Sequence, residues 1–202
     1  MLRKSIVVLL LASLLMFVPA GSATTYNIDA NHSNVGFAVS MLGGLSKVRG
    51  KYTSFTVNVD FNEADITKSS VTANIKADSI DTGIERRDTH LKSADFFDAA
   101  KYPEITFQSK RVEQKGDRYT AIGTFTMHGV SKEISIPFII TGKYTNPQTK
   151  ATTYGFSGRL KLNRQDYGIS YQSKNMPNWI SDEVEIELDL ITARPPENKA
   201  SR

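Results

Sequence analysis

Alternation of apolar and polar residues is the strongest constraint on what this chain folds into. The clearest case covers residues 183–190, where Val184, Ile186, Leu188 and Leu190 alternate with four acidic residues. Successive side chains of a β-strand point to opposite faces, so this run predicts a strand with one dry face and one solvated face. Comparable runs cover residues 35–39, 55–61, 71–77, 105–112, 119–126, 134–138 and 156–162.

These runs predict an all-β fold of about eight short antiparallel strands. Turn signals such as His128-Gly129 separate them, and connections this short favour antiparallel pairing. Pro137 has no backbone N–H to donate, which indicates a bulge or an edge in its strand. A sheet of this size folds over into a sandwich or closes into a barrel. Alternation does not distinguish a barrel filled by its own side chains from one that holds a small ligand.

Residues 84–101 interrupt the alternation and predict a short helical insert. The segment mixes charged residues, a histidine and two adjacent phenylalanines. Asp95 is expected to cap a helical turn over residues 96–100 by accepting from free amide groups, and Pro103 prevents the helix from continuing. A second irregular stretch is expected at residues 42–50, which form a loop with two adjacent glycines.

The first 23 residues have the composition of a signal peptide. Arg3 and Lys4 precede an apolar run over residues 6–18, and Gly21-Ser22-Ala23 supplies the small residues for cleavage after Ala23. That run is shorter than the roughly 20 residues that a membrane span requires. We therefore expect export of one domain over residues 24–193, followed by a disordered tail over residues 194–202. A secreted eukaryotic protein fits such a leader equally well, but the absence of cysteine favours the periplasm. The chain has no cysteine, so disulfides and thiolate metal ligands are excluded.

The net charge argues against nucleic acid as a partner. It is +4 for the whole chain and falls to about +2 once Arg3 and Lys4 leave with the leader, which is a small electrostatic footprint. His32, His90 and His128 lack the spacing typical of a metal site, and the sequence has no nucleophile elbow, P-loop or dinucleotide motif. We therefore expect no catalytic residue, metal or cofactor, as in a binding protein.

Three segments carry a resemblance to a known family. They are the central block over residues 86–107, the run His32-Ser33-Asn34-Val35-Gly36-Phe37 and the run Asp182-Glu183-Val184-Glu185-Ile186. With them, the chain after its leader resembles the YceI-like family of bacterial periplasmic polyisoprenoid-binding proteins. The resemblance implies a lipocalin-like barrel whose apolar lumen holds the tail of a long isoprenoid, such as a quinone or a polyprenyl phosphate, for transport, storage or stress protection. It is also compatible with a homodimer and with transient contact with the membrane surface.

Inward-facing apolar residues are the candidate contacts for such a tail. The lipid-binding candidates are Phe37, Val39, Met41, Phe55, Val57, Phe97, Phe107, Phe125, Met127, Phe138, Phe156, Leu160 and Trp179. Some aromatic residues lie in or beside the irregular segments and either gate an opening or anchor a loop. They are Phe96, Phe97, Tyr167, Tyr171 and Trp179. Many relatives carry a histidine where this chain has Val39-Ser40-Met41, so no exact headgroup site carries over from the resemblance.

Four potential cations, Arg86, Arg87, His90 and Lys92, lie within seven residues and are the headgroup candidates. A phosphate head suits such a cluster, because arginine offers a planar, bidentate donor fork. The alternative is that Arg87 and Asp88 pair with neighbours and fix the insert while Lys92 points into water. A neutral quinone needs no cation cluster, so this question bears on the class of ligand.

Two other functions stay open at this stage. One is an enzyme that acts on a lipid or quinone held in the lumen, with His90 and Asp88 as its acid and base. The other is a protein-interaction module whose barrel is solidly packed by its own side chains.

Overall fold

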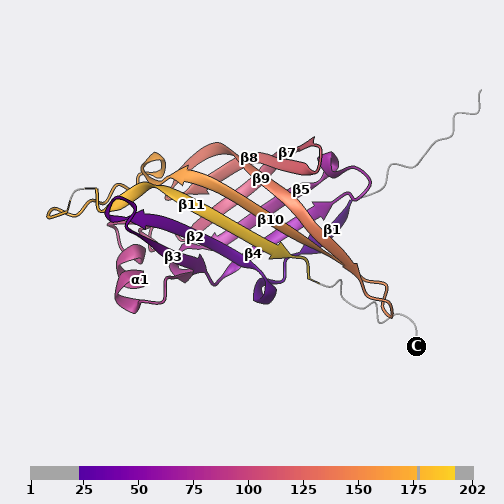
Figure 1. The fold of residues 1–202 in the computed structure, drawn as a ribbon, viewed down its shortest axis with the longest axis horizontal. Helices are drawn as coiled ribbons and strands as arrows, with labels where there is room; N and C mark the ends of the chain where they lie inside the picture. Colours follow the sequence, from indigo (N-terminus) through magenta and orange to yellow (C-terminus); the bar gives the residue numbers. More distant parts are fainter. Residues whose placement is uncertain (1–22, 177, 194–202) are drawn as a thin grey trace, which may run out of the picture.

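The computed structural model describes residues 23–176 and 178–193. The predicted leader, apart from Ala23, and the predicted C-terminal tail lie outside these residues. The described chain forms eleven strands and one α-helix, with short 3-10 turns between them (Figure 1). The strands are β1 (Thr24–Asn27), β2 (Asn34–Met41), β3 (Ser46–Tyr52), β4 (Phe55–Phe61), β5 (Ser70–Lys76), β6 (Ile80–Asp81), β7 (Glu104–Lys115), β8 (Arg118–Met127), β9 (Val130–Thr145), β10 (Thr152–Asn163) and β11 (Ile180–Ile191). The helix is α1 (Glu85–Lys92).

All eleven strands belong to one antiparallel sheet in the order β1-β4-β5-β7-β8-β9-β10-β11-β2-β3-β6. β3 and β4 each lie one strand in from an end of this order, and only Thr53 and Ser54 separate them in the chain, so the chain itself links the two sides of the sheet. The pairing therefore runs in a ring: β11 pairs with β2, β2 with β3, β3 continues into β4, and β4 pairs with β5. The sheet curls into a barrel.

The eleven segments form eight long strands, because three of these are interrupted at the same seam. β1 pairs with β4 and β2 pairs with β3, so the two segments run along one continuous neighbour. Asn27 pairs with Asn58 and Gly36 with Lys51, so nine residue steps on one side match seven on the other. β5 and β6 run along the same pair of strands, and their break is filled by a 3-10 turn, Ala77–Ser79. Ser79 accepts a backbone hydrogen bond from Thr53 there, at 3.1 Å. The predicted fold class, an antiparallel eight-stranded barrel with a helical insert, is confirmed.

The predicted loop over residues 42–50 is wrong, because most of it is strand. A 3-10 turn over Leu42–Gly44 leads directly into β3. The strand escapes the alternation pattern because Gly50 occupies an inward position. A Cβ on Gly50 would lie 2.4 Å from the ring of Phe37 on the paired strand. The glycine thus makes room for an aromatic side chain that lines the barrel.

Pro137 marks the point where β9 and β10 separate. Their pairing ends at Phe138 and Gly158, and from Pro137 to Val130 β9 pairs only with β8. The expected bulge or edge at this proline therefore takes the form of a local edge. On the outer face of the neighbouring wall, four of the five acidic residues of β11 form ion pairs with basic residues of β3 and β10. These pairs are Lys161–Glu183, Lys47–Glu185, Arg49–Glu187 and Arg159–Asp189.

The helical insert between β6 and β7 covers one end of the barrel (Figure 1). Its α-helix begins at Glu85 and ends at Lys92, inside the predicted range of 84–101. The predicted cap at Asp95 is wrong. The Asp95 carboxylate instead lies 2.8 Å from His90 Nε2, so it ties the segment after the helix back to the helix.

Candidate ligand-binding lumen

The barrel encloses a cavity of about 1040 Å³. Pockets for drug-sized ligands span roughly 300–1,000 Å³, so this one lies at the upper limit of that range. Apolar side chains from β2, β4, β5, β7, β8, β9, β10 and β11 form most of its wall. Many of them are only half-buried although they point inward, because they face the cavity and not a neighbouring side chain. Val39, Ala73, Leu160 and Ile186 are examples. The barrel is hollow, which answers the question that alternation left open.

One end of the lumen is closed by a cluster of aromatic residues. Phe61 and Tyr154 pack at a centroid distance of 4.6 Å, and Tyr26 meets Tyr154 edge-on at 5.5 Å. The Tyr154 side chain is 4% exposed, and its hydroxyl donates to the half-exposed Glu63 carboxylate at 2.8 Å. Burial, followed by the hydrogen bond to Glu63, raises the pKa of Tyr154. Lys143 also bonds Glu63 and is the main cause of that carboxylate's lowered pKa.

The opposite end lies under the helical insert. The rings of Phe96 and Tyr171 pack at a centroid distance of 4.7 Å in a tilted arrangement, and His90 meets each ring edge-on at 5.0 Å. All three of these side chains line the cavity, as does Trp179 beside β11. Burial beneath the insert raises the pKa of Tyr52, whose ring is 6.3 Å from that of Phe97. This end therefore combines an apolar wall with polar groups that reach the lumen, among them His90.

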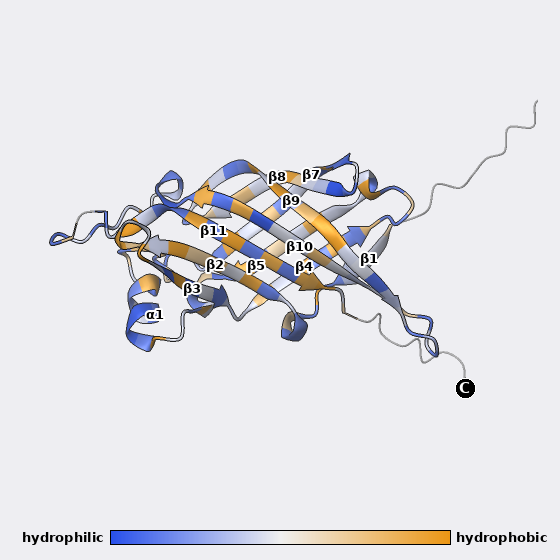
Figure 2. Ribbon diagram, in the orientation of Figure 1, coloured by the Kyte–Doolittle hydropathy of each residue, from blue (hydrophilic) through white to orange (hydrophobic). Residues whose placement is uncertain are grey.

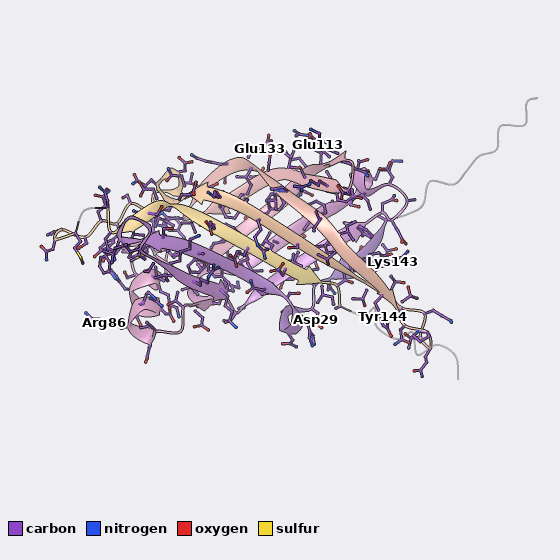
Figure 3. All side chains as sticks on the ribbon, viewed as in Figure 1. Asp29, Arg86, Glu113, Glu133, Lys143 and Tyr144 are labelled. Atoms are coloured by element: carbon purple, nitrogen blue, oxygen red, sulfur yellow. The ribbon has the colours of Figure 1, made fainter. Side chains whose placement is uncertain are left out.

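Most polar groups at this end hold the insert in place. The Arg87 guanidinium donates to the Thr82 hydroxyl at 2.7 Å and to the Thr82 carbonyl at 2.8 Å. Asp88 accepts from the Thr82 amide at 2.9 Å and from its hydroxyl. The predicted alternative, that Arg87 and Asp88 fix the insert, agrees with these bonds. Arg86 has no hydrogen-bond or ion-pair partner within residues 23–176 and 178–193, and it projects from α1 in Figure 3.

Arg164 is a buried cation that joins the loop after β10 to the start of β11 at the same end. Its guanidinium donates to the Ile169 carbonyl at 2.7 Å, to the Ser181 carbonyl at 3.2 Å and to Asp182 at 2.8 Å. The side chain is 6% exposed and borders the cavity. Because each of its donor groups is already paired, Arg164 stabilises the loop between β10 and β11 and has little capacity left for a ligand.

The structure places twelve of the thirteen lipid-binding candidates on the cavity wall. Phe55 is the exception: it lies next to the β3–β4 break and is not among the lining residues. Of the headgroup candidates, Arg86, Arg87 and His90 border the cavity and Lys92 does not. Of the aromatic residues expected at an opening, Tyr167 is 2% exposed, packs on Phe125 and does not line the cavity, so it anchors a loop.

Sequence reasoning missed a large part of the wall. The missed residues include Val48 and Tyr52 on β3, Ala73 and Ile75 on β5, Ile134 and Ile136 on β9, Val184, Ile186, Leu188 and Leu190 on β11, and Ile84 and Leu91 of the insert. The β5, β9 and β11 positions were visible as inward members of alternating runs. No signal separated them from core residues, because an apolar position looks the same in a filled and in a hollow barrel.

The acid and base considered for an enzyme are each bonded to another residue. Asp88 bonds Thr82, whereas His90 bonds Asp95, so the two groups serve different partners. His128 lies elsewhere, 2.9 Å from the Tyr167 carbonyl oxygen. Across the part of the chain that the structure describes, no three His, Cys, Asp or Glu residues gather as a metal site would require. No helix in that part is both long and apolar enough to cross a membrane.

Known proteins share this architecture. The YceI-like domain matches residues 26–192. A UPF0312 protein of Vibrio cholerae serotype O1 is 32% identical over 189 residues, which cover 92% of this chain and 98% of that protein. The crystal structure of Burkholderia cenocepacia BcnA matches with a TM-score of 0.74 at 23% identity, covering 82% of this chain and 99% of BcnA. A polyisoprenoid binding domain from Saccharophagus degradans, implicated in plant cell wall breakdown, matches with a TM-score of 0.64 at 18% identity, covering 84% and 98% of the two chains.

Proposed function

The chain belongs to the YceI-like family, and on that premise we propose that its lumen binds the hydrocarbon tail of an amphiphilic lipid, with a long polyisoprenoid as the expected cargo. The observation that carries the proposal is the apolar cavity of about 1040 Å³, enclosed by strands from the whole ring. The polyisoprenoid binding described for the Saccharophagus degradans domain supports the same class of cargo.

The size of the cavity favours cargo over an unfilled interior. An unfilled cavity leaves the side chains of its wall without packing partners, and the loss of free energy grows with its volume, which is about 1040 Å³ here. Water is a poor substitute, because a buried water needs two to four polar partners and this wall is mostly apolar. A hydrocarbon chain satisfies such a wall without hydrogen bonds.

The apolar wall supplies enough free energy for useful affinity. Burying ten methylene equivalents at about 0.8 kcal/mol each gives about 8 kcal/mol, which corresponds to micromolar binding before ordering costs. Immobilising a flexible chain subtracts from that figure, so tight binding requires a longer tail. The cavity volume exceeds what ten methylene groups occupy, and a long isoprenoid uses more of it.

The polar groups at the insert end favour a head with little charge. Arg87 is engaged by Thr82 and His90 by Asp95, so only Arg86 among the cavity-lining cations has no partner in the described chain. A pyrophosphate head would require several charge-assisted donors. One exposed arginine suits a quinone carbonyl or a single phosphate, and we place a quinone first.

We further propose that the protein works after export to the periplasm as a carrier or store and has no catalytic activity of its own. The leader-like composition of residues 1–23 supports export. The separate partners of Asp88 and His90 support binding without catalysis. Transport, storage and stress protection all follow from such a lumen, and a homodimer stays a prediction from the family resemblance.

The decisive experiment is organic extraction of the protein purified from its native source, followed by mass spectrometry. A matched pair of variants provides the control: Ile136→Glu places a carboxylate on the lumen wall, and the adjacent Ser135→Glu places one on the exposed outer face. We expect an isoprenoid in near-stoichiometric amount from the parent and from Ser135→Glu, and at least a tenfold loss from Ile136→Glu. Circular dichroism of each variant excludes unfolding as the cause.

Two outcomes would contradict the proposal. A blank extract from the parent, repeated after incubation with quinones and polyprenyl phosphates, would refute lipid binding and favour a protein-interaction module. Equal lipid content in Ile136→Glu and Ser135→Glu would place the lipid outside the lumen.

A further inference from the structure

The turn between β2 and β3 exposes two leucines at the insert end of the barrel. Leu42 is 49% exposed and Leu45 is 85% exposed, the highest value among the large apolar residues exposed in the described chain. Figure 2 shows this turn as a hydrophobic tip at the same end as α1. Gly43 and Gly44 lie between the leucines, and a side chain on either glycine would meet only open space. The tip therefore projects into solvent.

The backbone of this tip is held in a conformation that leucine rarely adopts. Leu42 has φ of 53°, and Gly43 and Gly44 follow with φ of 67° and 100°. A positive φ is uncommon for a non-glycine residue and costs free energy. The Leu42 side chain is half-exposed and does not enter the core, so packing does not compensate for the free energy of this strained backbone. Such strain at an exposed apolar residue is typical of a functional surface.

The tip adjoins another exposed apolar residue, Met176, and the lumen. The Leu42 amide donates to the Trp179 carbonyl at 2.8 Å, and the Trp179 amide donates to the Met176 carbonyl at 3.3 Å. Met176 is 42% exposed. Trp179 lines the cavity, as does Met41, which precedes the tip. We call Leu42, Leu45, Met176 and Trp179 the apolar rim.

The charges beside the apolar rim suit a phospholipid surface. Residues 41–47 and 171–179 contain Lys47 and Lys174 and no aspartate or glutamate. Lys174 has no ion-pair partner in the described part of the chain, whereas Lys47 pairs with Glu185 at 2.8 Å. Basic side chains around an apolar anchor, with tryptophan at the water boundary, are the usual composition of an interfacial membrane contact.

We propose that the apolar rim docks on a phospholipid bilayer and so places the mouth of the lumen against the source of its cargo. This inference rests on the proposed function, because it identifies the surface through which the lipid is exchanged. A second copy of the chain fits less well. A stable protein interface buries about 800 Å² on each partner, and a few exposed side chains cannot supply that area. Insertion of a few apolar side chains into a bilayer has no such minimum.

The test measures co-sedimentation of the mature protein with vesicles of phosphatidylethanolamine and phosphatidylglycerol. The rim variant combines Leu42→Asn with Leu45→Ser, since asparagine tolerates the positive φ of the first site. The control variant combines Ile139→Ser with Tyr144→Ser, which removes two exposed apolar side chains, 44% and 60% exposed, from β9. Figure 3 shows Tyr144 at the end of the molecule opposite Arg86 and the insert.

We expect the rim variant to partition to vesicles at least tenfold more weakly and the control variant within twofold of the parent. Trp179 is the only tryptophan, so brominated phospholipids in the same vesicles should quench its fluorescence in the parent and not in the rim variant. Unchanged partition of the rim variant, or an equal loss in the control variant, would overturn the proposal. A rim variant that instead loses self-association in gel filtration would also overturn it, in favour of a second copy.

Titration of the same proteins with geranylgeraniol in the absence of vesicles separates this proposal from the proposed function. Equal geranylgeraniol binding by parent and rim variant, together with lost vesicle partition, supports both. Parent protein that partitions to vesicles through the rim and binds no geranylgeraniol keeps the docking surface and refutes the lumen cargo. Parent protein that binds geranylgeraniol and does not partition to vesicles refutes the docking surface alone.

Discussion

Replacing Ala73 and Ala77 separately by phenylalanine tests whether the barrel is hollow. The two residues are four positions apart, Ala73 on β5 and Ala77 in the 3-10 turn that follows it. Ala73 lines the cavity, whereas Ala77 is 1% exposed and belongs to the packed cluster under the insert. The same added ring therefore meets free volume at one site and close-packed atoms at the other.

The magnitudes of the two changes differ in both stability and binding. Overpacking a filled site costs about 1–3 kcal/mol, so Ala77→Phe should lower the free energy of unfolding by at least that amount. Ala73→Phe should change it by less than about 1 kcal/mol, since the ring enters a cavity of about 1040 Å³. That ring displaces about four methylene groups of a bound tail, which at about 0.8 kcal/mol each weakens binding roughly a hundredfold or more.

Urea unfolding followed by circular dichroism measures the first effect, and titration with geranylgeraniol measures the second. Ala77→Phe serves as the control for binding, since its ring lies outside the lumen and any folded fraction should keep the parental affinity. Equal destabilisation by the two substitutions would refute a hollow lumen beside β5. Parental affinity in a folded Ala73→Phe protein would show that the tail does not pass this point.

Three further predictions follow from single contacts. Gly123→Ala should lower the free energy of unfolding by more than about 2 kcal/mol in urea titration, because its Cβ would lie 2.2 Å from the Gln108 carbonyl oxygen. Unchanged stability would mean that β7 shifts there, at the break in its register with β8 between Ser109 and Arg111. Arg164→Ala should cost about 3 kcal/mol and increase hydrogen exchange in the loop before β11, since it leaves three acceptors at this site without their donor. The hydrogen bond from Lys143 lowers the pKa of Glu63, so this pair stabilises the fold above pH 4.5, the ordinary pKa of the carboxyl group, and the stabilisation is lost as pH falls through the lowered pKa. Lys143→Gln should therefore raise the pKa of Glu63 in an NMR titration. An unchanged pKa would contradict the assigned cause.

The sequence predicts most of the strands and their inward faces, and it fails where one residue serves a partner far away. β3 was expected as a loop because Gly50 breaks its pattern, yet that glycine is required by Phe37 on the adjacent strand. The alternation along one strand does not show which side chains lie opposite it on the paired strand, so such a requirement for glycine cannot be predicted from it. In the insert, Asp95 has the composition of a helix cap but bonds His90, since a carboxylate is equally satisfied by either donor.

Lumen and core were indistinguishable in the sequence for a different reason. Alternation reports only which face of a strand is apolar, and the volume between opposite walls depends on how the sheet closes. Closure here depends on three chain breaks, at residues 28–33, 53–54 and 77–79, which let long strands bend across one seam. Each break reads locally as the end of a strand. The ring, and with it the space for a ligand, exists only when the register across the seam is known.

On the proposed function, the position of the polar groups gives an amphiphile in the apolar lumen one favoured orientation. The aromatic cluster of Phe61 and Tyr154 closes one end. There the Tyr154 hydroxyl donates to Glu63, and Glu63 also pairs with Lys143. At the other end, where Leu42 and Leu45 are exposed, Arg86 borders the cavity and has no partner in the described chain. On the proposed function, a bound amphiphile would gain by placing its tail toward the aromatic cluster and its head toward the insert. The head would then enter the lumen last on loading and leave the lumen first on release.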